Sequence, residues 1–151
     1  MTTVKDRIKS LVDWHQEIVA SARNRQNQLK YEDFSATARD QFRPHPKPVR
    51  ALGFENVPIV VDIQNNYFAE LFGFDLRHYY QEPACFVENY LKMNIARYEF
   101  VRDDRVFRNE ISIWLGTAFE TSMLGQDVIF QANEDPYNSI KPVINEPADL
   151  E

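Results

Sequence analysis

The sequence contains little cysteine and no long apolar run. Its single cysteine, Cys85, excludes a disulfide within the chain and a zinc site built on a cysteine pair. The longest strongly apolar windows, such as VPIVVDI, are far shorter than the ~20 residues of a transmembrane helix. The first residues also lack the uninterrupted apolar stretch of a signal peptide. We therefore expect a cytoplasmic protein that does not enter a membrane.

Positive charge is scarce relative to negative charge. The chain has 17 Lys and Arg against 23 Asp and Glu, which gives a formal net charge of −6, and no basic stripe interrupts this balance. An acidic field repels nucleic-acid phosphates and anionic lipid surfaces, so we expect neither as a partner. By contrast, 44% hydrophobic residues in a chain of 151 are enough for one packed core.

Helix signals are clearest at the start and in the middle of the chain. Thr3 and Asp6 have the spacing of a capping box, and apolar residues then recur at helical spacing over residues 4–22. Pro83 predicts the start of a second long helix, and short helices are expected at YFAELFG, DLRHYY and TAFETSMLG. The polar stretch RNRQNQLKYEDFSATARDQF and the proline-rich RPHPKPV are expected to form a connector, or an arm that lies on a partner.

Three β-rich runs alternate with these helices. NVPIVVDI is apolar on both alternations, which is typical of a parallel central strand that is buried on both faces. ISIWLG and QDVIFQ predict a second and a third strand. This order of elements predicts an α/β fold with parallel strands.

An ordered set of short motifs spans residues 55–151. A strand that starts with VP is followed by ELFG, DLRHYY, a proline-started helix, a DD pair, Gly-Thr near the end of the second strand, MLG and a closing PADLE. In this order they resemble the N-terminal part of the uroporphyrinogen decarboxylase superfamily, in its corrinoid-dependent methyltransferase branch. The resemblance implies a partial (β/α)₈ TIM barrel, about its first two βα units, preceded by an N-terminal helix and Pro-rich arm in residues 1–54.

Departures from the family pattern narrow the implied activity. The decarboxylases carry an arginine-rich motif after the first strand, where this chain has DIQNNYF, and an aspartate where it has Gly116. Porphyrinogen decarboxylation is therefore not expected. The zinc ligands of the related methyltransferases come from the C-terminal half of the barrel. The resemblance thus implies that this chain alone binds no cofactor, and that zinc and corrinoid come through partner chains.

Polar side chains follow the first two predicted strands, the position at which barrel enzymes place binding groups. After the first strand they could hold a small polar substrate, or could instead cap the next helix. After the second strand, a glycine would permit close approach of a ligand, while its neighbours would form an apolar wall or core and a helix cap. The substrate-binding candidates are Asp62, Gln64, Asn65, Tyr67, Trp114, Gly116 and Thr117.

Histidine and paired acids give weaker signals for chemistry. His15, His45 and His78 lack ligand spacing with one another, so we expect no metal site in this chain. Asp103 and Asp104 stand between two arginines, and we expect local ion pairs on a solvated turn in preference to a catalytic carboxylate pair. The sequence assigns no catalytic acid or base.

Two functional hypotheses follow from these observations. In the first, the chain is a small subunit of a split corrinoid-dependent methyltransferase, not catalytic alone, which completes the barrel of a larger uroporphyrinogen decarboxylase-like subunit and works with a corrinoid protein. In the second, it is a non-catalytic structural or regulatory subunit that pairs with itself or with a homologous full-length enzyme. A third possibility is a piece of a longer enzyme, since NEPADLE has the residues of a helix start at the very end of the chain.

Overall fold

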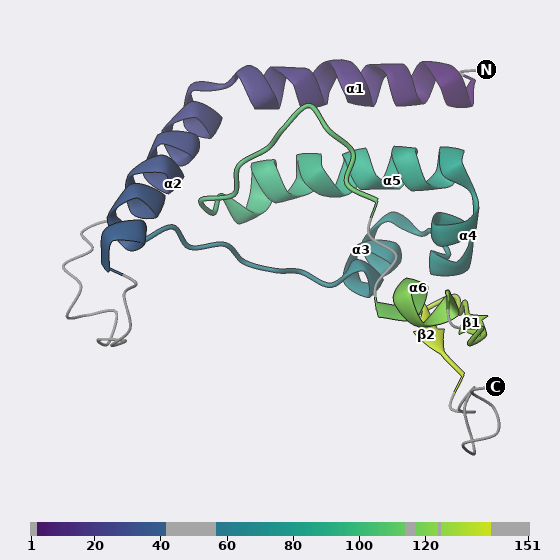
Figure 1. The fold of residues 1–151 in the computed structure, drawn as a ribbon. Coiled ribbons are helices and arrows are strands. Elements are labelled where there is room, and N and C mark those ends of the chain that lie inside the picture. Colours follow the sequence, from purple (N-terminus) through teal and green to yellow (C-terminus); the bar gives the residue numbers. More distant parts are fainter. Residues whose placement is uncertain (1–2, 42–56, 114–116, 124, 140–151) are drawn as a thin grey trace, which may run out of the picture. The chain divides into compact units, whose positions relative to one another are not determined.

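The computed structural model describes residues 3–41, 57–113, 117–123 and 125–139, with backbone only for residues 36–41, 117 and 119. These residues are mostly helical, with one small sheet (Figure 1). The elements are α1 (Val4–Ala20), α2 (Ala22–Gln41), α3 (Asn65–Phe72), α4 (Leu76–Gln81), α5 (Pro83–Ala96), the π-helical turn η2 (Arg97–Val101), α6 (Thr117–Ser122), β1 (Val128–Ile129) and β2 (Tyr137–Asn138).

The chain divides into two compact units. Unit 1 comprises the described residues of 1–62 and 91–110, and unit 2 those of 63–90 and 111–151, so the division falls inside α5.

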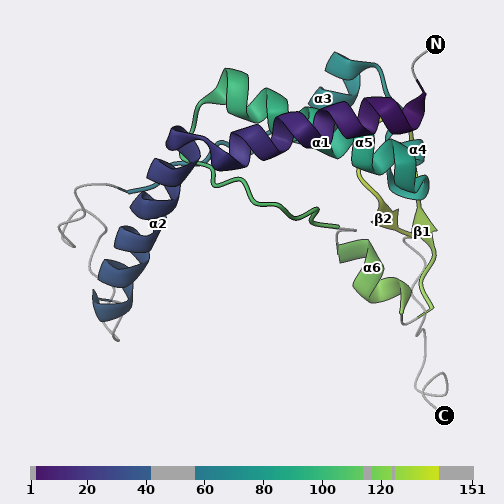
Figure 2. The same cartoon turned by 90° about the horizontal axis from the view of Figure 1, so that it is seen from above.

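The first helix forms as its local signals predict. The Thr3 hydroxyl accepts a hydrogen bond from the Asp6 N–H at 3.2 Å, and the Asp6 carboxylate accepts one from the Thr3 N–H at 3.1 Å. This capping box satisfies two donors at the start of α1. The helix ends at Ser21, which has an extended backbone, and α2 begins at the next residue after a sharp bend (Figures 1 and 2).

The second helix corrects the prediction of a connector or arm. Residues 22–41 form a continuous 20-residue helix, and residues 42–54 of the expected arm lie outside the described part of the chain. Helix formation is possible because residues 22–41 contain neither glycine nor proline. Its apolar periodicity is weak because polar residues, Asn24 and Asn27, occupy its buried positions. Hydrophobic patterning therefore does not reveal this helix.

The core of unit 1 joins α1, the end of α5 and a loop that follows η2. Ile18, Ile95 and Phe107 are each at most 6% exposed and pack together. The ring of Phe107 also receives two edge contacts, from His15 at 6.4 Å and from Tyr98 at 5.8 Å between ring centroids. Phe107 is thus the side chain that anchors the loop to the helices.

Unit 2 packs α3, α4 and the start of α5 through aromatic rings. Tyr79 is central, with Phe74, Tyr80 and Phe86 within 5.5 Å between centroids. The predicted ends of these helices are confirmed: Gly73 ends α3 in the left-handed region at φ 68°, Asp75 caps α4 and Pro83 opens α5.

Of the three predicted strands, only the last forms in the described residues. QDVIFQ contains β1, which pairs antiparallel with β2 in the register Val128↔Asn138 and Ile129↔Tyr137. Residues 57–63 and 111–113 form no strand, and no parallel pair occurs in the part of the chain that the structure describes. The expectation of burial is wrong for NVPIVVDI, since Ile59 is 66% exposed. The fold is mixed, mostly helical with a small antiparallel sheet.

Candidate functional site

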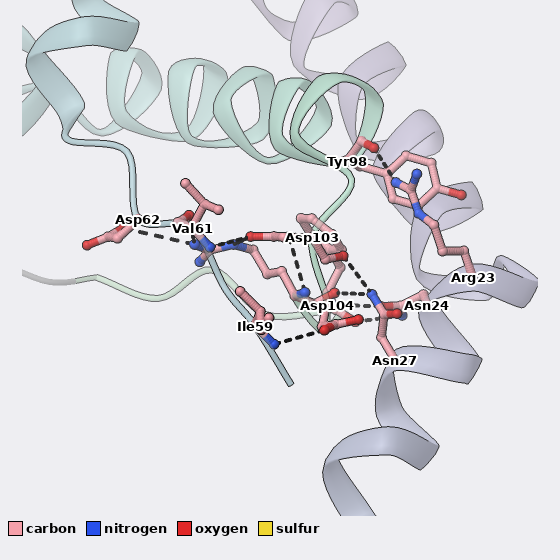
Figure 3. Close-up of polar contacts among 11 residues, drawn as sticks. Arg23, Asn24, Asn27, Ile59, Val61, Asp62, Tyr98, Asp103 and Asp104 are labelled. Atoms are coloured by element: carbon pink, nitrogen blue, oxygen red, sulfur yellow. Dashed lines mark hydrogen bonds and ion pairs between the residues drawn. The ribbon is translucent and has the colours of Figure 1, made fainter. Parts of the chain in front are cut away.

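In unit 1 an extended segment, residues 57–62, lies against an acidic loop, residues 103–107 (Figure 3). Ile59 makes the first contact through both of its backbone polar groups. Its N–H donates to Asp104 Oδ2 at 2.8 Å, and its C=O accepts from the Asp104 N–H at 2.9 Å. A carboxylate and a backbone amide of the loop therefore act as a neighbouring strand would.

Val61 makes the same pair of backbone contacts two residues later, but both of its partners are side chains of the loop. Its N–H donates to Asp103 Oδ2 at 2.8 Å, and its C=O accepts from Arg105 Nη2 at 3.0 Å. Alternate residues of an extended chain direct their N–H and C=O groups to the same edge. The acidic loop thus occupies the edge of the extended segment that Ile59 and Val61 form.

Two asparagines of α2 hold the acidic loop in place (Figure 3). Asn24 exchanges two hydrogen bonds with the backbone of Phe107: its Nδ2 donates to the C=O at 2.9 Å and its Oδ1 accepts from the N–H at 2.8 Å. Asn27 lies one turn further along, and its Nδ2 donates to the C=O groups of Asp103 and Arg105 at 3.2 and 3.0 Å. Because both asparagines are buried, their amide groups depend on these contacts for hydrogen bonding.

Each carboxylate of the acidic loop has a basic side chain nearby, Lys30 of α2 for Asp104 and Arg105 of the loop for Asp103. Lys30 Nζ lies 2.6 Å from Asp104 Oδ2, and Arg105 Nε lies 4.0 Å from Asp103 Oδ2. The hydrogen bond from Lys30, followed by that from the Ile59 N–H, lowers the pKa of Asp104 although partial burial opposes this shift. Asp104 is therefore an ionised acceptor at neutral pH.

The acidic pair lies in a different environment from the one predicted. Local ion pairing holds for Asp103 and Arg105, but a solvated turn does not, because the Asp103 side chain is only 5% exposed. The sequence reasoning also missed the partners from α2. Two asparagines three residues apart on a helix without an apolar face are the signal that could have found them, since buried amides at that spacing share one face.

The opposite edge of the extended segment is open. In the described residues, the N–H and C=O groups of Val60 meet no hydrogen-bond partner, and Pro58 has no N–H to donate. Three successive β-branched side chains are exposed here, Ile59 at 66%, Val60 at 39% and Val61 at 47%. Asp62 follows with a side chain 91% exposed, 3.9 Å from Arg105. An unpaired edge with apolar side chains is typical of an association surface.

A second polar cluster, in unit 2, contains the candidate Asn65. The hydroxyl of Tyr80 donates to Asp135 Oδ1 at 2.5 Å, and Asn65 Nδ2 donates to the Tyr80 oxygen at 2.8 Å. Burial first, and the hydrogen bond to Asp135 second, raise the pKa of Tyr80 above its usual range. The Leu76 N–H donates to the C=O of Ala132 at 2.9 Å, so these contacts fasten residues 132–135 to α3 and α4.

Two further substrate-binding candidates, Gln64 and Tyr67, belong to α3 and its N-cap. Gln64 is the N-cap of α3 but makes no side-chain capping bond, and Tyr67 is 64% exposed on α3. Among the described residues of unit 2, no hydrogen bond joins the side chains of Asn65 and Tyr67. Of the candidates after the second predicted strand, Trp114 and Gly116 lie outside the described residues. Thr117 is the first residue of α6, and only its backbone is described.

Metal ligands do not gather in the described part of the chain. It contains no group of three His, Cys, Asp or Glu residues arranged to hold a metal ion. His15 is buried in the core of unit 1, and His78 lies on α4. Within the same residues, no helix has both the length and the apolar character needed to cross a bilayer.

The fold and the site define a mostly helical protein with an exposed extended segment supported by an acidic loop. Comparisons with protein-family models, with curated proteins and with solved structures gave no match. The function is therefore argued from the geometry of the site.

Proposed function

We propose that this chain is a cytoplasmic structural subunit that acts by association, with the extended segment (residues 57–62) as its contact surface. The exposure of Ile59, Val60 and Val61 carries the proposal. A run of exposed β-branched residues is a liability for a free protein, because it favours contact with other chains.

The support beneath the segment strengthens this proposal. Backbone groups of Ile59 and Val61 are held by the acidic loop, which is itself held by Asn24 and Asn27. Association therefore costs little further ordering of this backbone, and a pre-organised surface binds more tightly than a mobile one of equal area.

The test compares two exposed apolar residues of unit 1. Ile59→Ser changes the extended segment, whereas Leu29→Ser changes a residue that is 56% exposed on α2 and serves as the matched control. Native mass spectrometry of the tagged full chain measures the assembly, both as isolated at its natural level and for the purified chain at about 100 µM, where weak association is also populated. We expect Ile59→Ser to reduce assembly about tenfold, as for an apolar residue at the centre of a contact, and Leu29→Ser to leave it unchanged. Equal assembly of the two variants would refute the proposal.

A second candidate function is the split methyltransferase implied by the resemblance of residues 55–151 to the uroporphyrinogen decarboxylase superfamily. The open edge at Val60 favours it, because a strand that joins a partner's barrel needs a free edge. In this proposal the larger subunit supplies zinc, a corrinoid or a thiol accepts the methyl group, and Asp62 is one of the residues that this chain contributes to a shared pocket for a small substrate.

The two candidates differ in what the chain adds to an enzyme. The measurement is methyl transfer from substrate to the corrinoid, followed by the absorbance of the cobalt centre, for a larger homologous subunit with and without this chain. The second candidate requires a rate that depends on the chain and falls with Asp62→Ala. A rate that does not depend on the chain would refute it and leave the structural role.

A further inference from the structure

The extended segment has two edges with different partners. The edge formed by Ile59 and Val61 is occupied by the acidic loop. The intervening residues, Pro58, Val60 and Asp62, direct their backbone groups to the other edge, because the direction alternates along an extended chain. No described residue bonds to the N–H or C=O of Val60.

We propose that the occupant of this open edge is a second copy of the same chain. The two segments pair antiparallel about a twofold axis, with the two Val60 residues opposite each other. In this register they exchange both of their hydrogen bonds, and each Asp62 N–H donates to the Pro58 C=O of the other copy. The inference rests on the proposed role of the segment in association and names its partner.

The charges and the proline of the edge favour self-pairing in this register. Asp62, with a side chain 91% exposed, faces Pro58 of the second copy and not another carboxylate. A pairing centred on Asp62 would oppose two like charges directly, which is destabilising. The missing N–H of Pro58 falls at the end of the ribbon, where the unpaired C=O of Asp62 is left to water. In this register the segment is therefore complementary to itself in hydrogen bonding, and no two like charges stand opposite each other.

The geometry around the segment also suits a twofold dimer. The acidic loop occupies the outer edge of each copy at Ile59 and Val61, so a third segment could not pair there and the ribbon would close as a dimer. Valine opposite valine is a favourable cross-strand pair. Because the ribbon is short, we expect a weak dimer, with a dissociation constant on the order of 10 to 100 µM.

The first experiment removes one donor from the open edge. Val60→Pro in the full chain deletes the N–H that the proposal uses, and its restricted φ suits an extended backbone. Val60→Thr keeps the N–H and the β-branched shape and is the matched control. In sedimentation equilibrium we expect Val60→Pro to weaken dimerisation at least tenfold and Val60→Thr by less than threefold.

A second experiment does not depend on the proline variant folding. In a Cys85→Ser background, Val60→Cys should be cross-linked to a dimer by a short bifunctional thiol reagent. Opposite residues of a hydrogen-bonded antiparallel pair have Cβ atoms about 5.5 Å apart, slightly too far for a direct disulfide but well within the span of such a reagent. Leu29→Cys, on the exposed face of α2, should not be cross-linked.

Three results would overturn the inference: a wild-type chain that stays monomeric at 1 mM, a dimer that Val60→Pro leaves intact, or loss in Val60→Pro of binding to a different protein only. None of these results bears on the comparison of Ile59→Ser with Leu29→Ser. Failure of self-pairing and failure of the proposed function are therefore distinguishable.

Discussion

Replacement of Asn24 by alanine should destabilise unit 1 more than any other single change on α2. Asn24 is 4% exposed and links the end of α1, α2 and the acidic loop. Its Nδ2 donates to the C=O groups of Val19 and Phe107, each at 2.9 Å, and its Oδ1 accepts from the Phe107 N–H at 2.8 Å. Asn24→Ala removes all three contacts without supplying a substitute.

The magnitude follows from the groups left behind. A buried polar group that loses its partner costs about 1–3 kcal/mol, and the N–H and C=O of Phe107 are both buried with that residue. Alanine regains roughly 0.5 kcal/mol in helix propensity. We therefore expect Asn24→Ala to lower the free energy of unfolding of unit 1 by about 2–4 kcal/mol. Because the loop supports the extended segment, association through the segment should weaken as well.

The assay is urea unfolding followed by the fluorescence of Trp14 in a Trp114→Phe background, which leaves one tryptophan in the chain, on α1. Gln26→Ala, at an exposed position of the same helix, is the matched control and should change stability by less than about 0.5 kcal/mol. A loss for Asn24→Ala within about 0.5 kcal/mol of the control would refute the view that asparagine contacts, rather than apolar packing alone, hold the loop.

Three further outcomes test other parts of the structure. Burial lowers the pKa of His15, so below the usual histidine pKa of about 6.5 the unfolded chain binds more protons than the folded one. The free energy of unfolding of unit 1 should therefore fall from pH 7.5 to 5.5, by at most about 1.4 kcal/mol per pH unit. In urea titrations, His15→Leu should abolish this slope. The pKa of Tyr80 is raised, so its contribution to the stability of unit 2 should be fully present below about pH 10 and be lost as the pH rises further. Tyr80→Phe should remove this pH dependence and lower the free energy of unfolding at pH 7 by about 1 kcal/mol. Thermal unfolding at a series of pH values measures both effects. Gly73 has φ 68° and open space around a Cβ, so Gly73→Ala should cost roughly 1 kcal/mol and Gly73→Asn less, measured by circular dichroism.

Helix boundaries were the features that could be predicted from short stretches of sequence. The capping box of Thr3 and Asp6, the left-handed Gly73 and the opening Pro83 act within one helical turn, so the residues near each boundary contain the necessary information. The same reasoning failed for α2. Its buried face is amide, and hydrophobic periodicity detects only faces that are apolar.

The first predicted strand shows a different kind of error. The β-branched residues of NVPIVVDI correctly indicate an extended backbone, because branching at Cβ favours extended over helical conformations. The partner of that backbone was predicted wrongly. It is a loop more than 40 residues away, which offers carboxylates and a guanidinium in place of a second strand.

Candidate sites were the hardest features to predict, for the same reason. Asp62 and Asn65 stand close together in the sequence, yet Asp62 lies at an exposed edge of unit 1 and Asn65 binds Tyr80 and Asp135 in unit 2. The sequence around Asp103 and Asp104 is typical of a solvated turn, but in the folded chain Asn27 and Lys30 contact these two residues.

The sequence by itself therefore determined the net charge through its composition, and the helix ends, the third strand and the extended form of residues 57–62 through local residue preferences. Tertiary structure alone decided which edge of that segment is occupied and which is open. The reason is physical: capping and backbone preference act within a few residues, whereas the hydrogen bonds of an extended chain are satisfied only by groups that folding brings to it.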